Sequence, residues 1–480
     1  MVKEYKLFIN GEWVEAEGGK TFDDINPATG EVYAKVAMAS RADAQKAIQA
    51  AHQAWRDWAL KPAHDRAVIL YKASQILEQS MQEYASVLQE ESGSVFIKSM
   101  FETGYTIGLI RSTAEDSKLV LGETFPSETD KFCMTIRQPR GVIAAISPWN
   151  FPLLLSINKI GHALAAGNTV VLKPSSETPV IGLKIAELFE KAGLPAGVLN
   201  VVTGPGPTVG DELVVNSKVR LVTLTGETVT GRKVAEKAGA NLKPVVLELG
   251  GKDPVIVLKD ADLDYAVDAV CFGAFMHQGE ICMSVERVIV EKQIADEFSK
   301  RLAAKAKTLR IGDPKDPKTI IGPLINQKQL QTVDTQVKDA VERGAKLMCG
   351  GKYKGLFYEP TVLSGVTREM RIFREETFGP TAPIIAVKDV DEAIEVANDT
   401  EYGLSSGVIT NDLQKALYIA ERLESGMVHI NDASVYDEPY APFGGVKASG
   451  IGREGGKVSM DTLTELKWIT IQKGKRHFPF

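Results

Sequence analysis

The chain has 480 residues, of which 44% are hydrophobic and 25% are charged, and its formal net charge at pH 7 is −6. This composition is typical of a globular protein with about two to four domains. The acidic balance, with Lys and Arg spread along the chain, argues against nucleic acid or an anionic membrane surface as the main partner.

The predicted elements begin with a hairpin around the turn Asn10-Gly11. Amphipathic patterns then predict helices over 41–60 and 63–91. Further helices are expected from Leu153, Thr178, Thr208, Gly231, Leu263 and Ile294. The runs between them include GVIAAIS, NTVVLKP, VLNVVTG, VRLVTLTG, KPVVLEL, PVIVL and RVIVE. This alternation indicates a doubly wound parallel sheet, and a second α/β series starts near Gly251 without a low-complexity linker.

Two strand-like segments, 131–140 and 467–473, fit neither series. They could pair with each other or lie on an edge shared between subunits. The most apolar stretch, 141–157, is interrupted by prolines and is too broken to span a bilayer. We therefore expect no membrane-spanning segment.

Two glycine-containing turns are candidate phosphate-binding loops. In the first, Gly204 to Gly210, Pro205 and Pro207 remove backbone N–H donors and the spacing is GxGxxxG, so a tight strand-to-helix turn is the better interpretation. The second, LTGETVTG at 224–231, offers free N–H groups and hydroxyls at a helix N-terminus. Both pyrophosphate binding and a simple N-capped helix are compatible with it.

Cys282 lies in a predicted loop, whereas Cys271 falls within an apolar helix and is expected to be inert core. The four cysteines form no CxxC pair and are too sparse for a disulfide framework, which favours reduced thiols in a cytoplasmic protein. Cys282 is either a buried inert thiol or a nucleophile activated by N–H donors, a cation or a base. His277, five residues upstream, is expected to pack or to contact substrate, and no residue cluster has metal-ligand spacing.

Two further side chains, Glu248 and Asn150, follow or end predicted strands, where functional residues of α/β folds commonly lie. Glu248 ends an otherwise apolar strand at the junction of the two series, which predicts that it faces a cleft. Asn150 is held between Pro148 and Pro152 and offers a rigid amide donor of the kind that stabilises an oxyanion. The alternatives are a capping or ion-paired role for Glu248 and a plain turn for Asn150.

Together these motifs resemble the aldehyde dehydrogenase superfamily over nearly the whole chain. The resemblance rests on SPWNFP, LKPSSETP, LTGETVTG, LELGGK, GEIC, EETFGP and PFGGVKASGIGRE, in the family's order. It implies that Cys282 attacks an aldehyde, that Asn150 and the N–H of Cys282 hold the oxyanion, and that hydride passes to a nicotinamide. It further implies that Glu248 activates the water that hydrolyses the thioester, with Glu454 as a proton relay.

The resemblance also implies the cofactor site. It assigns the following residues to that site: Trp149, Lys173, Ser175, Ser176, Gly226, Glu227, Thr228, Gly231, Leu249, Glu376 and Phe378. Ser176 stands where NAD-preferring members often carry a glutamate, so we expect both NAD and NADP to be accepted. Glu227 brings a negative charge near the phosphates and must point away or pair with a cation. Glu280 replaces the usual glutamine, with an open role.

The fold implied by the resemblance is an α/β fold with a doubly wound parallel cofactor-binding sheet, a second α/β catalytic domain and a small β extension. We place the dinucleotide-binding domain at 1–120 and 141–250 and the catalytic domain at 251–465. The oligomerisation strands are expected at 121–140 and 466–480, in a homodimer or homotetramer.

The expected substrate is a small aldehyde in an apolar, aromatic-friendly tunnel. Its walls are expected to include Tyr105, Leu109, Phe275, Met276, Met283 and Phe443. The loop NDASVYDEPYAPFGG resembles the pattern of benzaldehyde, vanillin and salicylaldehyde dehydrogenases, which favours an aromatic aldehyde. The alternatives are a broad aliphatic or semialdehyde dehydrogenase, a CoA-acylating enzyme and a non-catalytic nucleotide-binding relative.

Overall fold

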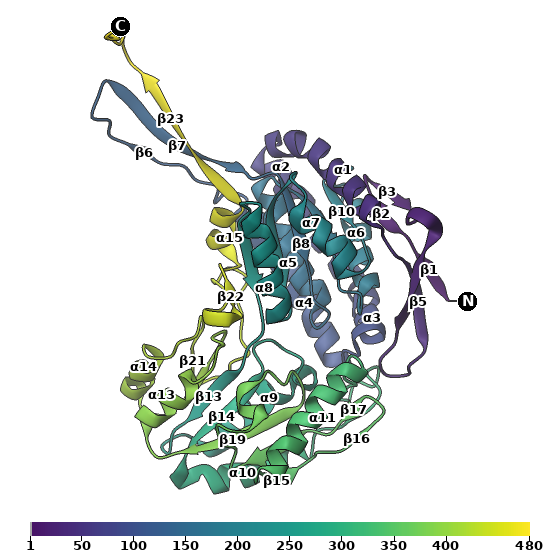
Figure 1. Ribbon diagram of the computed structural model, residues 1–480, viewed down its shortest axis with the longest axis vertical. Helices are drawn as coiled ribbons and strands as arrows, with labels where there is room; N and C mark the ends of the chain where they lie inside the picture. Colours follow the sequence, from purple (N-terminus) through teal and green to yellow (C-terminus); the bar gives the residue numbers. More distant parts are fainter. Residues whose placement is uncertain (1) are drawn as a thin grey trace.

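The computed structural model describes residues 2–480 and has two α/β lobes and a projecting arm (Figure 1). The purple and teal first half of the chain builds the upper lobe in this view, and the green segment builds the lower one. No helix within residues 2–480 is both long enough and apolar enough to cross a membrane.

The first lobe is built on an eight-stranded sheet with the order β22-β12-β11-β8-β9-β10-β2-β3. Its strands are β2 (Leu7–Ile9), β3 (Glu12–Val14), β8 (Val142–Ile146), β9 (Thr169–Lys173), β10 (Leu199–Val201), β11 (Val219–Thr225), β12 (Val245–Glu248) and β22 (Gly450–Ile451). The five strands from β12 to β10 run parallel, and β22, β2 and β3 add antiparallel edges.

Apolar side chains cover both faces of this sheet. On β8, Ile143 and Ala145 belong to one buried cluster, while Val142 and Ala144 belong to another on the opposite face. A parallel sheet covered by helices on both faces requires such continuous apolar runs. The doubly wound arrangement predicted from the sequence is therefore confirmed.

Helices pack on both faces of the first sheet, and a small sheet lies beside them. The helices are α1 (Arg41–Leu60), α2 (Ala63–Gln79), α3 (Met81–Ser92), α4 (Phe96–Asp116), α5 (Pro152–Ala166), α6 (Pro179–Lys191), α7 (Asp211–Val215) and α8 (Thr228–Ala240). The small sheet holds β1 (Lys3–Tyr5), β4 (Thr21–Ile25) and β5 (Val32–Ala37). The prediction of one helix over 63–91 is wrong, because Ser80 has φ and ψ angles of −110° and 19°, outside the helical region, and separates α2 from α3.

The second lobe has a seven-stranded sheet with the order β15-β18-β19-β14-β13-β20-β21, parallel except at β15. Its strands are β13 (Asp253–Val257), β14 (Val285–Glu291), β15 (Lys346–Cys349), β18 (Thr361–Ser364), β19 (Thr381–Val387), β20 (Gly407–Ile409) and β21 (His429–Ile430), with a separate hairpin of β16 (Tyr353–Lys354) and β17 (Phe357–Tyr358). Its helices are α9 (Leu263–Phe275), α10 (Lys292–Ala306), α11 (Gln327–Glu342), α12 (Arg371–Arg374), α13 (Val390–Asn398) and α14 (Leu413–Ala420).

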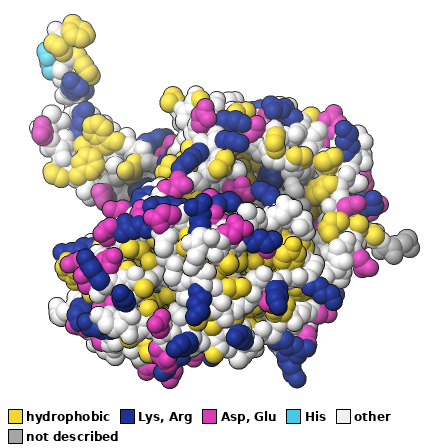
Figure 2. Space-filling view, turned by 60° about the horizontal axis from the view of Figure 1, so that its bottom comes forward, with side chains coloured by type: hydrophobic (Ala, Val, Ile, Leu, Met, Phe, Trp, Pro, Cys, Tyr) yellow, Lys and Arg dark blue, Asp and Glu magenta, His cyan; other side chains and the backbone are white. Residues whose placement is uncertain are grey.

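The two stray segments form the arm. β7 (Lys131–Pro139) pairs antiparallel with β23 (Thr464–Gln472) along its full length, and β6 (Thr124–Phe125) pairs with the other edge of β7. Of the two arrangements left open by the sequence, the structure shows that these segments pair with each other. Large apolar side chains of the arm are exposed, including Phe132, Leu466 and Trp468. Figure 2 shows the arm extending from the body with hydrophobic surface along it.

The chain returns to the first lobe before it reaches the arm. Gly450 and Ile451 of β22 pair with Glu248 and Leu247 of β12, and the following helix α15 (Gly456–Thr462) packs against α4 and α5. The last residues of the segment 251–465, expected to form the catalytic domain, thus contact the first lobe, and the domain bounds stay a prediction. An antiparallel edge strand covers the otherwise open backbone of β12, which explains why the return occurs here.

Candidate active site

Cys282 lies in the loop between α9 and β14, which we call the thiol loop, just after a short 3-10 turn. In this turn His277 and Gln278 have positive φ angles of 48° and 44°, which are uncommon for residues with a side chain. Gly279 follows with a φ of 75°, and a Cβ atom there would lie 2.2 Å from the carbonyl oxygen of Gly379. The turn therefore folds the thiol loop tightly against the segment around Gly379.

Two cavities meet at this loop. A larger one of about 420 Å³ lies between α4, α5 and the loop after β21, and a smaller one of about 230 Å³ lies beside the carboxyl ends of β11 and β12. Of the described residues, only Cys282 and Asn150 line both. The thiol and the amide stand where a molecule in one cavity would meet a molecule in the other.

Glu248 ends β12 at the wall of the smaller cavity and is only 2% exposed. Neither of its carboxylate oxygens has a hydrogen-bond partner among residues 2–480. Burial raises the pKa of this carboxyl to about 7, although the nearby Cys282 thiol and Lys159 ammonium act in the opposite direction. A buried carboxylate without partners costs free energy, and a pKa near 7 suits it to accept and release protons at neutral pH.

The Cys282 thiol is held in its neutral form. Burial, followed by the negative charge of Glu248, raises its pKa well above the usual value for a cysteine. A neutral thiol is a poor nucleophile, so attack by this sulfur requires a proton acceptor. Glu248 is the carboxylate whose charge acts on this thiol most strongly, and it lines the same cavity.

Asn150 is buried and fixed from two sides. Its side-chain Nδ2 donates to the backbone carbonyl of Glu280 at 3.1 Å, and its own backbone carbonyl accepts from Lys98 Nζ at 2.7 Å. An amide nitrogen carries two hydrogens, so one N–H remains for a bound oxygen. The geometry suits an oxyanion donor beside the thiol.

Glu454 lines the larger cavity, and its carboxylate is fully hydrogen-bonded. One oxygen accepts from Lys159 Nζ at 2.7 Å and from Thr223 Oγ1 at 2.8 Å. The other accepts from Asn158 Nδ2 at 3.0 Å. Lys159 also interacts electrostatically with Glu248, so the two carboxylates share one ammonium group as a neighbour.

Several of the expected cofactor residues line the smaller cavity: Trp149, Gly226, Glu227, Leu249, Glu376 and Phe378. The rings of Trp149 and Phe378 meet edge to face with 5.4 Å between their centroids. Glu376 accepts from the backbone N–H of Gly251 at 2.9 Å. The exposed carboxylate of Glu227 pairs with Lys328 at 3.2 Å, so the expectation that its charge finds a cation is confirmed.

Five expected cofactor residues lie outside the lining of this cavity: Lys173, Ser175, Ser176, Thr228 and Gly231. Lys173 is buried at the end of β9, where its Nζ donates to the next carbonyl at 3.0 Å and burial lowers its pKa to about 8. Thr228 Oγ1 donates to the carbonyl of Ala448 at 3.3 Å. A Cβ atom on Gly231 would lie 2.4 Å from the Leu249 side chain, so this glycine lets Leu249 reach the cavity wall.

The larger cavity is lined by five of the six expected wall residues: Tyr105, Leu109, Met276, Met283 and Phe443. Phe275 is not among them, because it faces the core of the second lobe and is 1% exposed. Other apolar and aromatic residues of the wall were not predicted from the sequence, and they include Phe101, Leu154, Leu155 and Phe272.

Three acidic side chains at this cavity were not predicted from the sequence either: Asp432, Asp437 and Glu438. The DEP triplet in the loop after β21 was the available signal. Burial raises the pKa of Asp437 to about 6, so it is mostly ionised at pH 7.5. Among the described residues of the wall there is no Lys or Arg. The Tyr105 hydroxyl is buried with no hydrogen-bond partner in the described part of the chain.

Two neighbours of the thiol do not reach either cavity. His277 is 1% exposed and meets the ring of Phe151 edge to face, and burial lowers its pKa well below the usual value, so it is a neutral packing residue. The carboxylate of Glu280 accepts from the Ile325 N–H at 2.9 Å and from Gln278 Nε2 at 3.0 Å. It therefore anchors the thiol loop from outside the cavities. Across residues 2–480, no group of three His, Cys, Asp or Glu side chains is placed to hold a metal ion.

The family model for the aldehyde dehydrogenase family matches residues 13–469. The chain belongs to this family. As an aldehyde dehydrogenase it oxidises an aldehyde with NAD(P) as the hydride acceptor. The family match agrees with the resemblance that the sequence motifs carried.

This aldehyde dehydrogenase is similar in sequence to several bacterial enzymes. It is 42% identical to a vanillin dehydrogenase of Pseudomonas fluorescens, over 98% of this chain and 99% of that protein. It is also 42% identical to a glutarate-semialdehyde dehydrogenase of Pseudomonas putida, over 97% of each chain. A benzaldehyde dehydrogenase [NAD(+)] of Pseudomonas putida is 40% identical, over 99% of this chain and 98% of that protein.

Solved structures share the whole fold. A salicylaldehyde dehydrogenase from Pseudomonas putida G7, complexed with salicylaldehyde, matches with a TM-score of 0.97 and 39% identity over 100% of both chains. An E. coli NADP dependent enzyme matches with a TM-score of 0.96 and 40% identity over 98% of both chains. The two α/β lobes and the arm are therefore an aldehyde dehydrogenase fold.

The wall of the smaller cavity in this aldehyde dehydrogenase carries groups that suit part of a dinucleotide. A Cβ atom on Gly226 would meet open space, so a ligand can approach the backbone closely there. The 13-residue helix α8 begins directly after Glu227 of the cavity wall, and a helix N-terminus favours phosphate. Thr225 Oγ1 and the carboxylate oxygens of Glu248 are buried without partners in the described chain, which leaves polar groups for a bound molecule.

Proposed function

We propose that this aldehyde dehydrogenase oxidises aromatic aldehydes to carboxylic acids through a thioester on Cys282. The observation that supports this most strongly is the meeting of two cavities at Cys282 and Asn150. One cavity has an apolar, aromatic wall and the other suits a dinucleotide. The names of similar enzymes, vanillin and benzaldehyde dehydrogenases, point to the same substrate class.

In the first half-reaction, Glu248 accepts the thiol proton and the sulfur of Cys282 bonds to the carbonyl carbon. The electron pair of the carbonyl moves to its oxygen, which accepts from Asn150 Nδ2 and from the backbone N–H of Cys282. The bound nicotinamide supplies a two-electron acceptor for the hydride. When the hydride leaves, the oxygen regains its double bond and an acyl group remains on the sulfur.

In the second half-reaction, Glu248 removes a proton from water, and the hydroxide attacks the thioester. The C–S bond breaks, the carboxylic acid leaves and the electron pair returns to sulfur. A carboxyl group with a pKa of about 7 can serve as base in both steps, provided that it loses its proton between them. We assign this release to Glu454: its carboxylate, which forms a buried ion pair with Lys159 beside Glu248, accepts the proton and passes it on to water.

Cofactor choice is part of the proposal. We expect both NAD and NADP to be used, because Ser176 supplies no carboxylate against a 2′-phosphate. Of the other proposed cofactor residues, Trp149, Glu376 and Phe378 hold the nicotinamide end, and Gly226 approaches the pyrophosphate. Lys173, Ser175, Ser176, Thr228 and Gly231 belong to the adenosine side or shape the helix behind it.

The main alternative is a semialdehyde as substrate, since a glutarate-semialdehyde dehydrogenase is equally similar. The larger cavity argues against a carboxylate tail. Asp437 and Glu438 give its wall negative charge, and within the described residues of the wall there is no cation to offset it. Like charges in a partly desolvated site repel each other.

A substrate panel tests the proposal. We would measure kcat/KM for benzaldehyde, vanillin, hexanal and succinate semialdehyde with each nicotinamide cofactor, without CoA, and with a Cys282→Ser preparation as the control for contaminating activity. The aromatic aldehydes should exceed the others by about tenfold or more. A wide lead for succinate semialdehyde would overturn the aromatic assignment, and a strict need for CoA would overturn hydrolysis by Glu248.

We also propose that the protein is a cytoplasmic homodimer or homotetramer. The exposed apolar side chains of the arm support self-association, because such side chains are commonly covered in an assembly. Light scattering of the full chain and of a Trp468→Lys variant would test this. The variant should have the lower mass, and a monomeric parent protein would contradict the proposal.

A further inference from the structure

Lys98 on α4 is a fully buried lysine whose three N–H groups all have acceptors. It donates to Glu102 Oε2 at 2.5 Å, to Ser94 Oγ at 2.9 Å and to the backbone carbonyl of Asn150 at 2.7 Å. Lys98 is 1% exposed and Glu102 is 0% exposed. Desolvating such an ion pair costs free energy that replacement by apolar residues would avoid, so stability alone is weak grounds for its presence.

Glu102, the ion-pair partner of Lys98, contacts the residues that follow Asn150. Its second carboxylate oxygen accepts from the backbone N–H groups of Leu153 and Leu154, at 2.9 Å and 3.1 Å. These belong to the first turn of α5, which has no side-chain cap of its own at Phe151. Glu102 therefore satisfies helix N–H groups that would otherwise be unpaired, and its charge suits the helix N-terminus.

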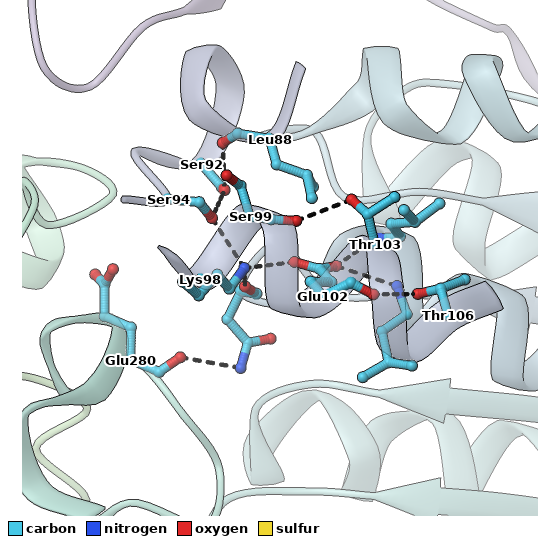
Figure 3. A network of polar contacts seen from close by, with 12 residues as sticks. Leu88, Ser92, Ser94, Lys98, Ser99, Glu102, Thr103, Thr106 and Glu280 are labelled. Atoms are coloured by element: carbon cyan, nitrogen blue, oxygen red, sulfur yellow. Dashed lines mark hydrogen bonds and ion pairs between the residues drawn. The ribbon is translucent and has the colours of Figure 1, made fainter. Parts of the chain in front are cut away.

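The two residues bracket the turn that carries the oxyanion donor. Lys98 holds the carbonyl of Asn150, Glu102 holds the N–H groups three and four residues later, and Lys98 also lies 4.1 Å from the centroid of the Phe151 ring. Behind the pair, Ser94 shares a hydrogen bond with Ser92, whose hydroxyl donates to the carbonyl of Leu88. Figure 3 shows this network converging on Lys98 and Glu102 from α4 and the preceding turn.

The Asn150 amide is held separately by the thiol loop. Its Nδ2 donates to the carbonyl of Glu280, two residues before Cys282, and the carboxylate of Glu280 is anchored by Ile325 and Gln278. The backbone of Asn150 is thus fixed by the first lobe, and its side chain by the second. Because both the backbone and the side chain of Asn150 are held, the second N–H of its amide points in a fixed direction.

We infer that Lys98 and Glu102 are positioning residues that aim the Asn150 amide at the oxyanion formed on Cys282. This rests on the proposed roles of Asn150 and Cys282. Neither member of the pair lines a cavity, so neither touches the reacting atoms. Their effect on the reaction passes through the position of the 150–154 turn, and a displacement of about 1 Å there would cost on the order of 10²-fold in rate.

A double-mutant cycle tests the inference. We would measure the single-turnover rate of hydride transfer for benzaldehyde, followed by the absorbance of the reduced cofactor, in four full-length proteins: the parent, Lys98→Met, Asn150→Ala and the double variant. Lys98→Met should slow the parent by about 10–10²-fold. In the Asn150→Ala background the same change should cost no more than about twofold, because the group that Lys98 positions is gone.

A second readout separates positioning from collapse of the site. The rate at which iodoacetamide alkylates Cys282 depends on the thiol and on Glu248, and it should be unchanged in Lys98→Met. A matched control is Lys184→Met, which removes another largely buried, ion-paired lysine, on α6 and away from both cavities. This variant should keep the parent rate of hydride transfer.

The outcomes are distinct. An equal loss in both backgrounds, or a parent rate in Lys98→Met, would overturn the positioning role while leaving the proposed function intact. A parent rate in Asn150→Ala would instead overturn the proposed role of the amide. If Lys98→Met does not fold, Glu102→Gln and the milder Ser94→Ala replace it in the same double-mutant cycle. For these variants too, an equal loss of rate in the parent and in the Asn150→Ala background would contradict the inference.

Discussion

The two cavities that meet at Cys282 each contain one buried glutamate, and the two glutamates have opposite surroundings. Glu248, in the smaller cavity, has no hydrogen-bond partner among the described residues. Glu454, in the larger cavity, accepts three hydrogen bonds, including one from the ammonium of Lys159. Burial raises the pKa of Glu248 to about 7, so this carboxylate can change its protonation state near neutral pH, whereas three donors fix the position of the Glu454 carboxylate.

The largest expected effect comes from removing the sulfur that lies between the two glutamates. Cys282→Ser should lower kcat for aldehyde oxidation by more than about 10⁴-fold, because a hydroxyl beside Glu248 is a far weaker nucleophile than a thiol. Steady-state formation of the reduced cofactor measures this. Binding of NAD, followed by quenching of protein fluorescence, should persist. Oxidation at the parent rate would show that neither cavity serves a covalent mechanism.

The next effect tests the unpaired glutamate. Glu248→Gln should reduce kcat by about 10²–10⁴-fold, since the amide cannot accept a proton from the thiol or from water. The carboxyl group acts as a base only when ionised, and its pKa is about 7, so kcat/KM of the parent enzyme should rise with pH through about 7 and level off above it. A pH profile of both proteins checks this.

The pH profiles of the parent enzyme and of Glu248→Gln should differ. The limb near pH 7 should disappear in Glu248→Gln. A variant that keeps the limb at reduced rate would mean that another group, such as the Cys282 thiol, titrates there instead.

Replacing Glu454 should affect stability, because its ion-pair partner Lys159 would lose its counter-charge. Glu454→Gln leaves the ammonium of Lys159 buried without its counter-charge, and breaking a buried ion pair costs roughly 3–5 kcal/mol of stability. The apparent Tm by calorimetry should therefore fall, whereas Glu248→Gln should not lower it. Removing both charges in Lys159→Met/Glu454→Gln should recover part of the loss. An unchanged Tm in Glu454→Gln would contradict the pairing.

The sequence predicted those parts of the structure that depend on local pattern. The helix over 41–60, the alternation of strands and helices, and the pairing of 131–140 with 467–473 each follow from periodicity or from a strand that lacks a neighbour. Five of the six residues predicted for the substrate wall line the larger cavity, but these five are a minority of its lining. Phe275 was misplaced, since one position along a helix decides between core and cavity.

Contacts between segments that are distant in the sequence could not be predicted from it. A Lys and a Glu four residues apart, such as Lys98 and Glu102, usually indicate a solvated helix face, and only the tertiary structure buries them against Asn150. The return of the chain at Gly450 was missed because a two-residue strand carries no periodic signal. The burial of Lys173 likewise depends on elements packed around the end of β9.

The smallest expected effect concerns substrate choice in the larger cavity. Asp437 is a half-buried carboxyl of the wall with a pKa of about 6, so it is ionised at pH 7.5 and becomes neutral as the pH falls through 6. Its charge should repel a substrate carboxylate and should leave an uncharged ring unaffected. Asp437→Asn should therefore raise kcat/KM for succinate semialdehyde by roughly tenfold and change that for benzaldehyde by less than about twofold.

The same ratio should respond to pH in the parent enzyme. The preference for benzaldehyde over succinate semialdehyde should weaken between pH 7.5 and pH 5.5, because protonation removes the charge on Asp437, and Asp437→Asn should show no such change. Taking the ratio of two substrates on one protein cancels the titration of Glu248, which affects both alike. A ratio that stays constant with pH in the parent, or one that varies equally in the variant, would assign the discrimination to the shape of the aromatic wall rather than to its charge.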